Sequence, residues 1–186
     1  MHTTAATRRP PAGPLVLLLG AALAALGGCA GGVDVTPDSL RKARARWEKA
    51  GVRDYDLDWA SSGPRNSRFA VSVRGGRVRS VETVTPDGRR FPVKPAEPKF
   101  YGVEGLFLTI ADDLAQLKQP EPFGQPRGVK SVLRFEPDPE YGYPLRYRRD
   151  VLGSTSALAI DVMHFTPVAP ESRPEGDPTR PEKTDR

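Results

Sequence analysis

Apolar residues recur at helical spacing in two stretches of this chain. The first stretch follows Thr36-Pro37, a pair suited to a helix start, and Gly51 is suited to its end. The second begins at Val103 and stops before Pro120, because proline cannot continue a helix. The spacing therefore predicts two amphipathic helices. Their apolar stripes comprise Leu40, Ala43, Trp47 and Ala50, and then Val103, Leu106, Phe107, Ile110, Leu114 and Leu117.

Elsewhere apolar and polar residues alternate with a period of two, which predicts strands with one buried face. Gly75-Gly76 is typical of a hairpin turn, and the proline-rich stretch 85–99 is predicted to be mostly loop, with one short strand at 90–93. The element order αβββαβββ predicts an α+β fold, with an antiparallel sheet of about five to six strands and two amphipathic helices on one face. The main predicted strands cover residues 55–59, 69–73, 77–84, 129–135, 145–149 and 157–165.

The same pattern sets the limits of the folded domain. Residues 36–166 are expected to form an α+β globular domain. Residues 167–186 are dense in proline and charge and hold few apolar groups, which predicts a disordered tail. The face of the sheet away from the helices is expected to carry several arginines, namely Arg74, Arg79, Arg134, Arg146 and Arg148.

Residues 1–28 resemble a bacterial lipoprotein signal peptide. Arg8-Arg9 gives a positive start, and the apolar run 14–26 is shorter than a membrane-spanning helix needs. The run ends in Leu26-Gly27-Gly28-Cys29, which resembles the lipobox, and Cys29 is the only cysteine in the chain. Acylation of Cys29 is therefore predicted, with residues 29–35 as a lipidated tether. The alternatives are a plain secretory signal or an N-terminal membrane helix, in which Cys29 plays no part.

Composition narrows the classes of function. One cysteine permits neither an internal disulfide nor a multi-cysteine zinc site, and two histidines, His2 and His164, leave little for a histidine metal site. No metal and no cofactor are expected. Residues 29–186 carry 26 basic and 23 acidic side chains, a net charge of +3. An exported protein of such modest charge is not expected to bind nucleic acid. Its predicted location is the cell envelope, anchored to a membrane and facing the periplasm or the exterior.

Four short motifs stand out between residues 46 and 144. They are Arg46-Trp47-x3-Gly51-x3-Tyr55, Val71-x-Val73-x-Gly75-Gly76-x-Val78, Gly105-Leu106-Phe107, and Phe135 through Gly142-Tyr143-Pro144. Together they resemble the bacterial lipoprotein family catalogued as domain of unknown function 6174. The resemblance covers most of residues 46–165 and implies an exported lipoprotein of unknown activity, without catalytic residues. Several family members carry a cysteine pair in the first hairpin, where this chain has Ser61-Ser62-Gly63-Pro64.

Three groupings of polar residues could carry chemistry, and the spacing favours a structural role for each. Asp54, Asp56 and Asp58 could bind Ca²⁺, but carboxylates on one strand face stand about 7 Å apart. Asp161 and His164 lie three apart on a strand and are expected on opposite faces, and no nucleophile elbow is present. A glycosidase pair would need two carboxylates at a fixed separation, which the sequence does not set for its candidates. These candidates are Glu97, Glu104, Asp112, Asp113 and Glu121.

The turn at residues 137–144 is the strongest binding candidate in the sequence. Tyr141 and Tyr143 lie in it, and Arg146 and Arg148 follow. Aromatic and arginine side chains at a turn are typical anchors of a binding surface. The alternative is that Tyr143 and the proline after it only stiffen a hairpin.

The sequence thus favours a membrane-anchored, non-catalytic binding module of the cell envelope. Its partners would be the lipid membrane, through acylated Cys29, and an envelope protein or polymer. An envelope hydrolase with an unrecognised site is one alternative. An inhibitor of a secreted enzyme is another, and it would need a rigid protruding loop, for which residues 137–144 are the candidate.

Overall fold

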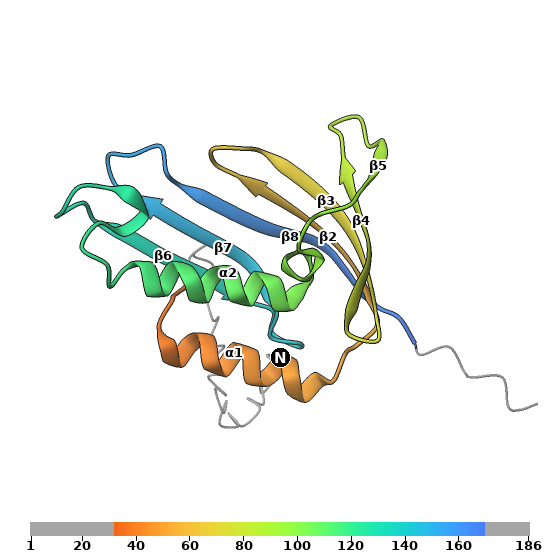
Figure 1. Cartoon of the computed structure of the whole chain (residues 1–186). Helices are drawn as coiled ribbons and strands as arrows, with labels where there is room; N and C mark the ends of the chain where they lie inside the picture. Colours follow the sequence, from red (N-terminus) through yellow and green to blue (C-terminus); the bar gives the residue numbers. More distant parts are fainter. Residues whose placement is uncertain (1–31, 170–186) are drawn as a thin grey trace, which may run out of the picture. The chain divides into compact units, whose positions relative to one another are not determined.

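The structure is a computed structural model that describes residues 32–169. The predicted signal peptide, Cys29 and most of the predicted tail, from residue 170 on, lie outside the described residues. The α+β class, the antiparallel sheet and the two helices are as predicted (Figure 1). The elements are β1 (Val33–Asp34), α1 (Pro37–Ala50), β2 (Tyr55–Ser62), β3 (Ser67–Arg74), β4 (Arg77–Val84), β5 (Arg90–Val93), the 3-10 helix η1 (Pro98–Tyr101), α2 (Val103–Gln116), the 3-10 helix η2 (Pro122–Gly124), β6 (Ser131–Pro137), β7 (Pro144–Val151) and β8 (Leu158–Pro167).

The sheet has eight strands among the described residues, in the order β1-β6-β7-β8-β2-β3-β4-β5, and every neighbouring pair is antiparallel. The expectation of five to six strands was too low. The six main strands are there, the short strand predicted at 90–93 is β5, and β1 lies in the stretch that was predicted to be the tether. The last strand, β8, lies near the middle and joins β6–β7 to β2–β3. The two halves of the sheet are therefore joined only when β8 is in place.

Both limits of the domain lie slightly outside the predicted ones. The predicted tether extended to residue 35, but Val33 pairs with Phe135 in the sheet and Val35 is buried. At the other end β8 continues through Pro167, and the backbone N–H of Val168 donates to the oxygen of Asp54. At either end of the domain only two or three residues are added to the sheet. A period of two cannot be recognised over so few residues, so the sequence did not predict this pairing.

Helix α1 begins and ends where the sequence predicts. The Thr36 side chain accepts from the backbone N–H of Ser39, and the Ser39 side chain accepts from Thr36 in return, which is a capping box. Gly51 ends the helix in the left-handed conformation. Its buried residues are Ala43 and Trp47.

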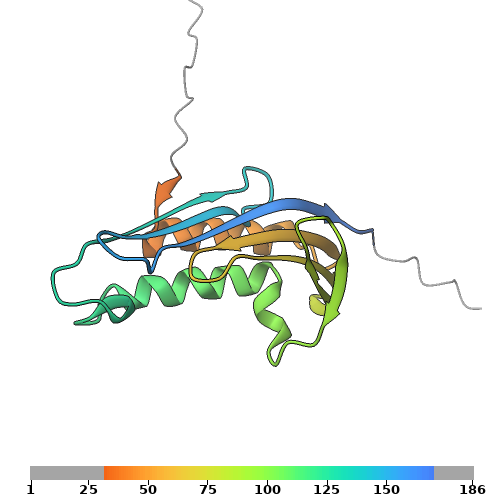
Figure 2. The same cartoon turned by 90° about the horizontal axis from the view of Figure 1, so that it is seen from above.

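Both helices pack their buried side chains into one core on one face of the sheet. Helix α2 runs along this face, and Figure 2 shows the sheet above it. The core combines Trp47 of α1 and Phe107 of α2 with inward residues of the strands, such as Leu57, Phe135 and Tyr147. Neither helix within residues 32–169 is long and apolar enough to cross a membrane.

Residues of the family-like motifs meet at one buried junction of this core. Tyr55 is fully buried, its ring lies 5.5 Å from that of Trp47, and its hydroxyl accepts from the N–H of Val103, the first residue of α2. The same hydroxyl donates to Glu104, as does the indole N–H of Trp47. Burial, together with the nearby Glu104 charge, raises the pKa of Tyr55. These motif residues therefore fix α1 and α2 to the sheet.

The face of the sheet away from the helices is polar and laced with ion pairs. Arg146 and Arg148 both contact Asp161, at 3.9 and 2.7 Å, and Arg134 lies 3.5 Å from Asp34. Arg74 and Asp56 pair at 3.0 Å on the other half of the sheet. Most of the arginines predicted for this face are therefore there. Arg79 differs from the others because it has no partner residue on β3. It is the extra residue in a bulge between β3 and β4.

Candidate functional site

The four side chains predicted to form a binding surface lie on two faces of the sheet. Tyr141 and Tyr143 pack against Phe165, with ring centroids 5.4 and 4.5 Å away, on the helix side. Arg146 and Arg148 extend from the opposite face, where they meet Asp161. Tyr143 is buried, at 6% exposure, and burial raises its pKa to about 12. The structure thus does not bring the four together into one contact surface.

The turn at 137–144 does not protrude as an inhibitor loop would. The backbone N–H groups of Glu140 and Tyr141 both donate to the Asp138 carboxylate, which closes the turn on itself. Arg46 of α1 donates to the oxygen of Pro139 at 3.4 Å. Gly142 has a positive φ of 84°, and a Cβ there would lie 2.6 Å from a backbone oxygen of α1. The turn is therefore packed against α1.

A polar hollow of about 460 Å³ lies on the open face of the sheet. Asp56 and Asp58, two of the three predicted aspartates, line it together with His164. Their carboxylates are paired with arginines, Asp56 with Arg74 at 3.0 Å and Asp58 with Arg90 at 3.1 Å. The hydrogen bond from Arg74 lowers the pKa of Asp56. Asp54 lies before the strand, where its carboxylate accepts from the Gly75 N–H.

The expectation that Asp161 and His164 lie on opposite faces was wrong. Asp161 pairs with Ala60 and His164 pairs with Asp58, two residues apart on β2, so both side chains share the open face. The reason is a β-bulge that inserts Met163 as an extra residue. The His164 ring lies 2.9 Å from Thr166 Oγ1, and within residues 32–169 it makes no hydrogen bond to a carboxylate.

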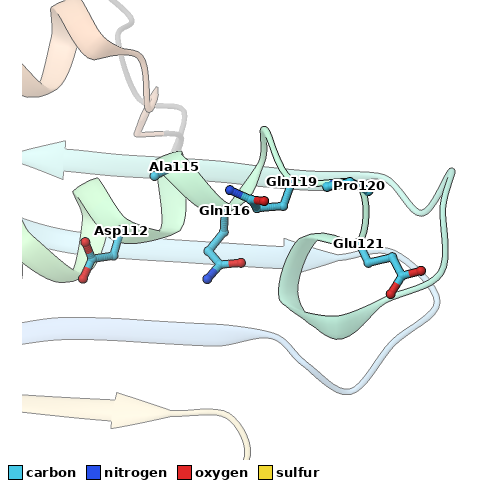
Figure 3. A pocket seen from close by; sticks show the side chains of 6 residues that line it. All are labelled: Asp112, Ala115, Gln116, Gln119, Pro120 and Glu121. Carbon is cyan, nitrogen blue, oxygen red and sulfur yellow. The ribbon is translucent and has the colours of Figure 1, made fainter.

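The predicted carboxylates do not gather as a glycosidase pair. Glu104 is held by Trp47 and Tyr55, and Asp113 accepts from Tyr147 and Arg149 in the core. Glu97 lies elsewhere, 3.6 Å from Lys99. Asp112 and Glu121 line one open hollow of about 660 Å³ at the end of α2, but Figure 3 places them at its opposite ends.

An apolar recess lies beside α2 on the helix side of the sheet. It has a volume of about 600 Å³ and opens to solvent. Residues of the segment between β5 and α2, which includes η1, form one wall, and residues of the inner face of the sheet form the other. Its lining residues are Trp59, Ser61, Phe69, Pro95, Ala96, Glu97, Phe100, Tyr101, Thr109, Leu158 and Ile160. We call this the aromatic recess.

Three rings hold the aromatic recess in shape. Trp59 and Phe69 lie side by side on β2 and β3, with centroids 4.9 Å apart, and the Tyr101 ring stands edge-on to Phe69 at 5.0 Å. The indole N–H of Trp59 donates to the backbone oxygen of Tyr101 at 3.0 Å. This bond ties η1 to the sheet. Phe100, 36% exposed, also lines the recess.

Gly105 sets how closely η1 approaches α2. A Cβ at this position would lie 2.3 Å from the backbone carbon of Phe100, so only glycine fits. Helix propensity alone would make Gly105→Ala stabilising by about 1 kcal/mol. We expect the overlap to outweigh this and to give a net loss of about 2 kcal/mol in the free energy of unfolding. Urea titration measures the loss, with Gln116→Ala on an exposed site of the same helix as the control. A Gly105→Ala variant as stable as the parent would contradict the close approach.

Sequence reasoning missed the aromatic recess because its walls come from segments distant along the chain. Phe100 lies between the predicted loop at 85–99 and the predicted helix from Val103, and the pattern predicts Trp59 and Phe69 only as strand residues. The signal present was the pair Phe100-Tyr101 directly after the proline-rich loop, since exposed aromatic residues outside regular structure need an apolar partner. No known family model and no curated protein matches this chain. The family resemblance therefore stays a prediction.

Proposed function

We propose that this chain is a bacterial lipoprotein, acylated at Cys29, whose folded domain is a non-catalytic binding module of the cell envelope. The observation that carries the binding role is the aromatic recess. Its rings are pre-positioned by mutual packing and by the Trp59–Tyr101 hydrogen bond, so little order has to be created when a ligand enters. Apolar recesses with a few polar groups are the usual form of binding sites.

The proposed ligand is an apolar side chain or acyl group carried by an envelope protein or polymer. Most of the lining is aromatic or aliphatic, and the indole N–H of Trp59 is already used within the protein. The lining also offers a few polar groups to a ligand, namely the hydroxyls of Ser61 and Thr109 and the carboxylate of Glu97. A volume of about 600 Å³ has room for one or two bulky groups rather than a whole chain.

An envelope hydrolase is the alternative, and the hollow around His164 is the observation that favours it. Polar groups do converge there from β2, β3, β4 and β8. However, Asp56 and Asp58 form ion pairs with arginines, and the ring of His164 is hydrogen-bonded to Thr166. A general base needs an orienting partner of its own. The two proposals place the functional site on different faces of the sheet. A hydrolase would depend on His164 on the open face, and the binding module depends on Phe100 on the helix side.

Phe100→Ser is expected to weaken binding of an apolar probe by at least about tenfold, because burial of a phenyl group contributes about 1.5–3 kcal/mol. The probe is anilinonaphthalene sulfonate, titrated against the purified protein and followed by energy transfer from tryptophan. Trp59 lies in the recess, so bound probe quenches its emission. Circular dichroism checks that the variant is folded, as we expect for a residue that is already 36% exposed.

Phe91→Ser is the matched control for this titration. Phe91 is also an exposed phenylalanine, at 46%, but it lies on β5 and does not line the recess. The control should bind the probe as the parent does. Equal binding by the Phe100→Ser and Phe91→Ser variants would remove the recess as the binding site.

A further inference from the structure

Helix α1 carries most of the excess charge of the chain on its outer face. It holds five basic and two acidic side chains, an excess of three, which equals the net charge of residues 29–186. The Arg41 and Lys42 side chains are 72% and 75% exposed, and Lys49 in the last turn is exposed too. Ala43 and Trp47 point into the core from the other side. The basic groups therefore form one outward surface, which we call the α1 basic face.

The α1 basic face lies close to the predicted acylation site. Cys29 precedes Val33, the first residue of β1, by four residues, which can span at most about 14 Å. The Ser39 hydroxyl in α1 donates to the backbone oxygen of Asp34 at 3.0 Å, so the first turn of α1 is tied to β1. A domain held by so short a tether lies against the membrane, and the first turn of α1 lies beside the anchored strand.

We propose that the α1 basic face rests on anionic phospholipid headgroups beside acylated Cys29, with Arg41, Lys42 and Lys49 as the main contacts. This inference rests on the acylation proposed above. Each basic side chain close to an anionic membrane strengthens binding about fivefold. The short tether keeps these groups near the surface, where their attraction is screened only beyond about 8 Å at physiological salt.

Ion pairs within α1 do not cancel this attraction. Asp38 pairs with both Arg41 and Lys42, and Arg44 pairs with Glu48. All these side chains are about half exposed or more, and ion pairs at such exposure contribute little. Headgroup phosphates can therefore bind Arg41 and Lys42 in place of the Asp38 carboxylate or together with it. Lys49 adds a further positive charge.

The α1 basic face and the aromatic recess do not overlap. No residue of α1 is among those that line the recess, which come from β2, β3, β8, α2 and the segment before α2. Contact between the α1 basic face and lipid therefore uses no residue of the recess, which stays open to a partner in the envelope.

The test uses the lipidated protein with one new cysteine as a label site. Acylation converts the Cys29 sulfur into a thioether, so an introduced thiol is the only reactive one. Ala45→Cys places a fluorophore on the exposed side of α1, and Ser62→Cys places it on the open face of the sheet, away from the helices. Each protein is reconstituted into phosphatidylcholine vesicles with or without phosphatidylglycerol that carry a headgroup quencher. We expect strong quenching at position 45 and little at position 62.

A charge variant separates orientation from attachment. The triple change Arg41→Gln, Lys42→Gln, Lys49→Gln should abolish the extra quenching that phosphatidylglycerol causes at position 45, as should 1 M salt. The triple change Lys94→Gln, Lys118→Gln, Arg127→Gln removes the same charge from exposed sites elsewhere and should leave the quenching unchanged. Equal quenching at 45 and 62 on vesicles that retain the protein would overturn the orientation alone. Protein that does not remain with either kind of vesicle would instead contradict the acyl anchor.

Discussion

Cys29→Ala is expected to abolish incorporation of a palmitate analogue and to remove the protein from the lipoprotein fraction of the membrane. Without the thiol no diacylglyceryl group can be attached, and the lipoprotein peptidase then has no substrate. The protein should be released into the soluble envelope fraction or keep its signal uncleaved. One acyl chain holds a protein only reversibly, whereas the two or three chains of a lipoprotein hold it stably. The expected effect is therefore complete rather than partial.

The measurement is labelling of growing bacterial cells with an alkyne palmitate analogue, followed by separation of membrane and soluble fractions. The double change Cys29→Ala, Ala30→Cys is the matched control, because it keeps one thiol but moves it one residue beyond the lipobox spacing. It should also lose the label. Unchanged labelling of Cys29→Ala, or membrane attachment with a cleaved signal, would remove the lipid anchor from the proposed function.

The helices and strands of this protein were predictable because their signals are local. Thr36, Pro37 and Gly51 mark the ends of α1 within the sequence itself, and the observed helix follows them. The alternation at Tyr55, Leu57 and Trp59 likewise identified the buried face of β2. Such signals depend on a period of 3.6 or 2 and on cap residues, which act over a few positions.

The features that the sequence did not predict depend on contacts between distant segments. A bulge at Met163 brought Asp161 and His164 to one face, and nothing in the local alternation marks it. Tyr143 was expected at a binding surface, but Trp47 and Phe165, far from it in sequence, enclose its ring. The aromatic recess, which is now the binding candidate, was not predicted because segments distant in sequence form it.

Asp113 is the clearest case of a polar residue that the helical pattern misplaced. It is not part of the apolar stripe predicted for α2, yet it is only 7% exposed. Its partners are on β7, where the Tyr147 hydroxyl donates to it at 2.7 Å and Arg149 at 2.8 Å. Arg149 also stacks on the ring of Phe123 at 4.5 Å. Burial and the bond to Asp113 raise the pKa of Tyr147.

Asp113→Ala is expected to lower the free energy of unfolding by about 3–5 kcal/mol, because removal of one partner leaves a buried charge without compensation. Arg149 is only 16% exposed in its side chain, so water cannot fully replace the lost carboxylate. The Tyr147 hydroxyl, in a fully buried side chain, loses its acceptor as well. Asp113→Asn, which keeps an acceptor but not the charge, should lose less.

Asp112→Ala is the matched control for this prediction, because it removes the same charge one residue earlier in the same helix. Asp112 is exposed at the open hollow of Figure 3, so its loss should change the stability by no more than about 0.5 kcal/mol. Urea titration of the three variants gives the comparison. Equal stabilities of Asp113→Ala and Asp112→Ala would show that the buried Asp113–Tyr147–Arg149 contacts do not hold α2 to the sheet. A large difference would show that Asp113, the one buried carboxylate found within residues 32–169, stabilises the fold.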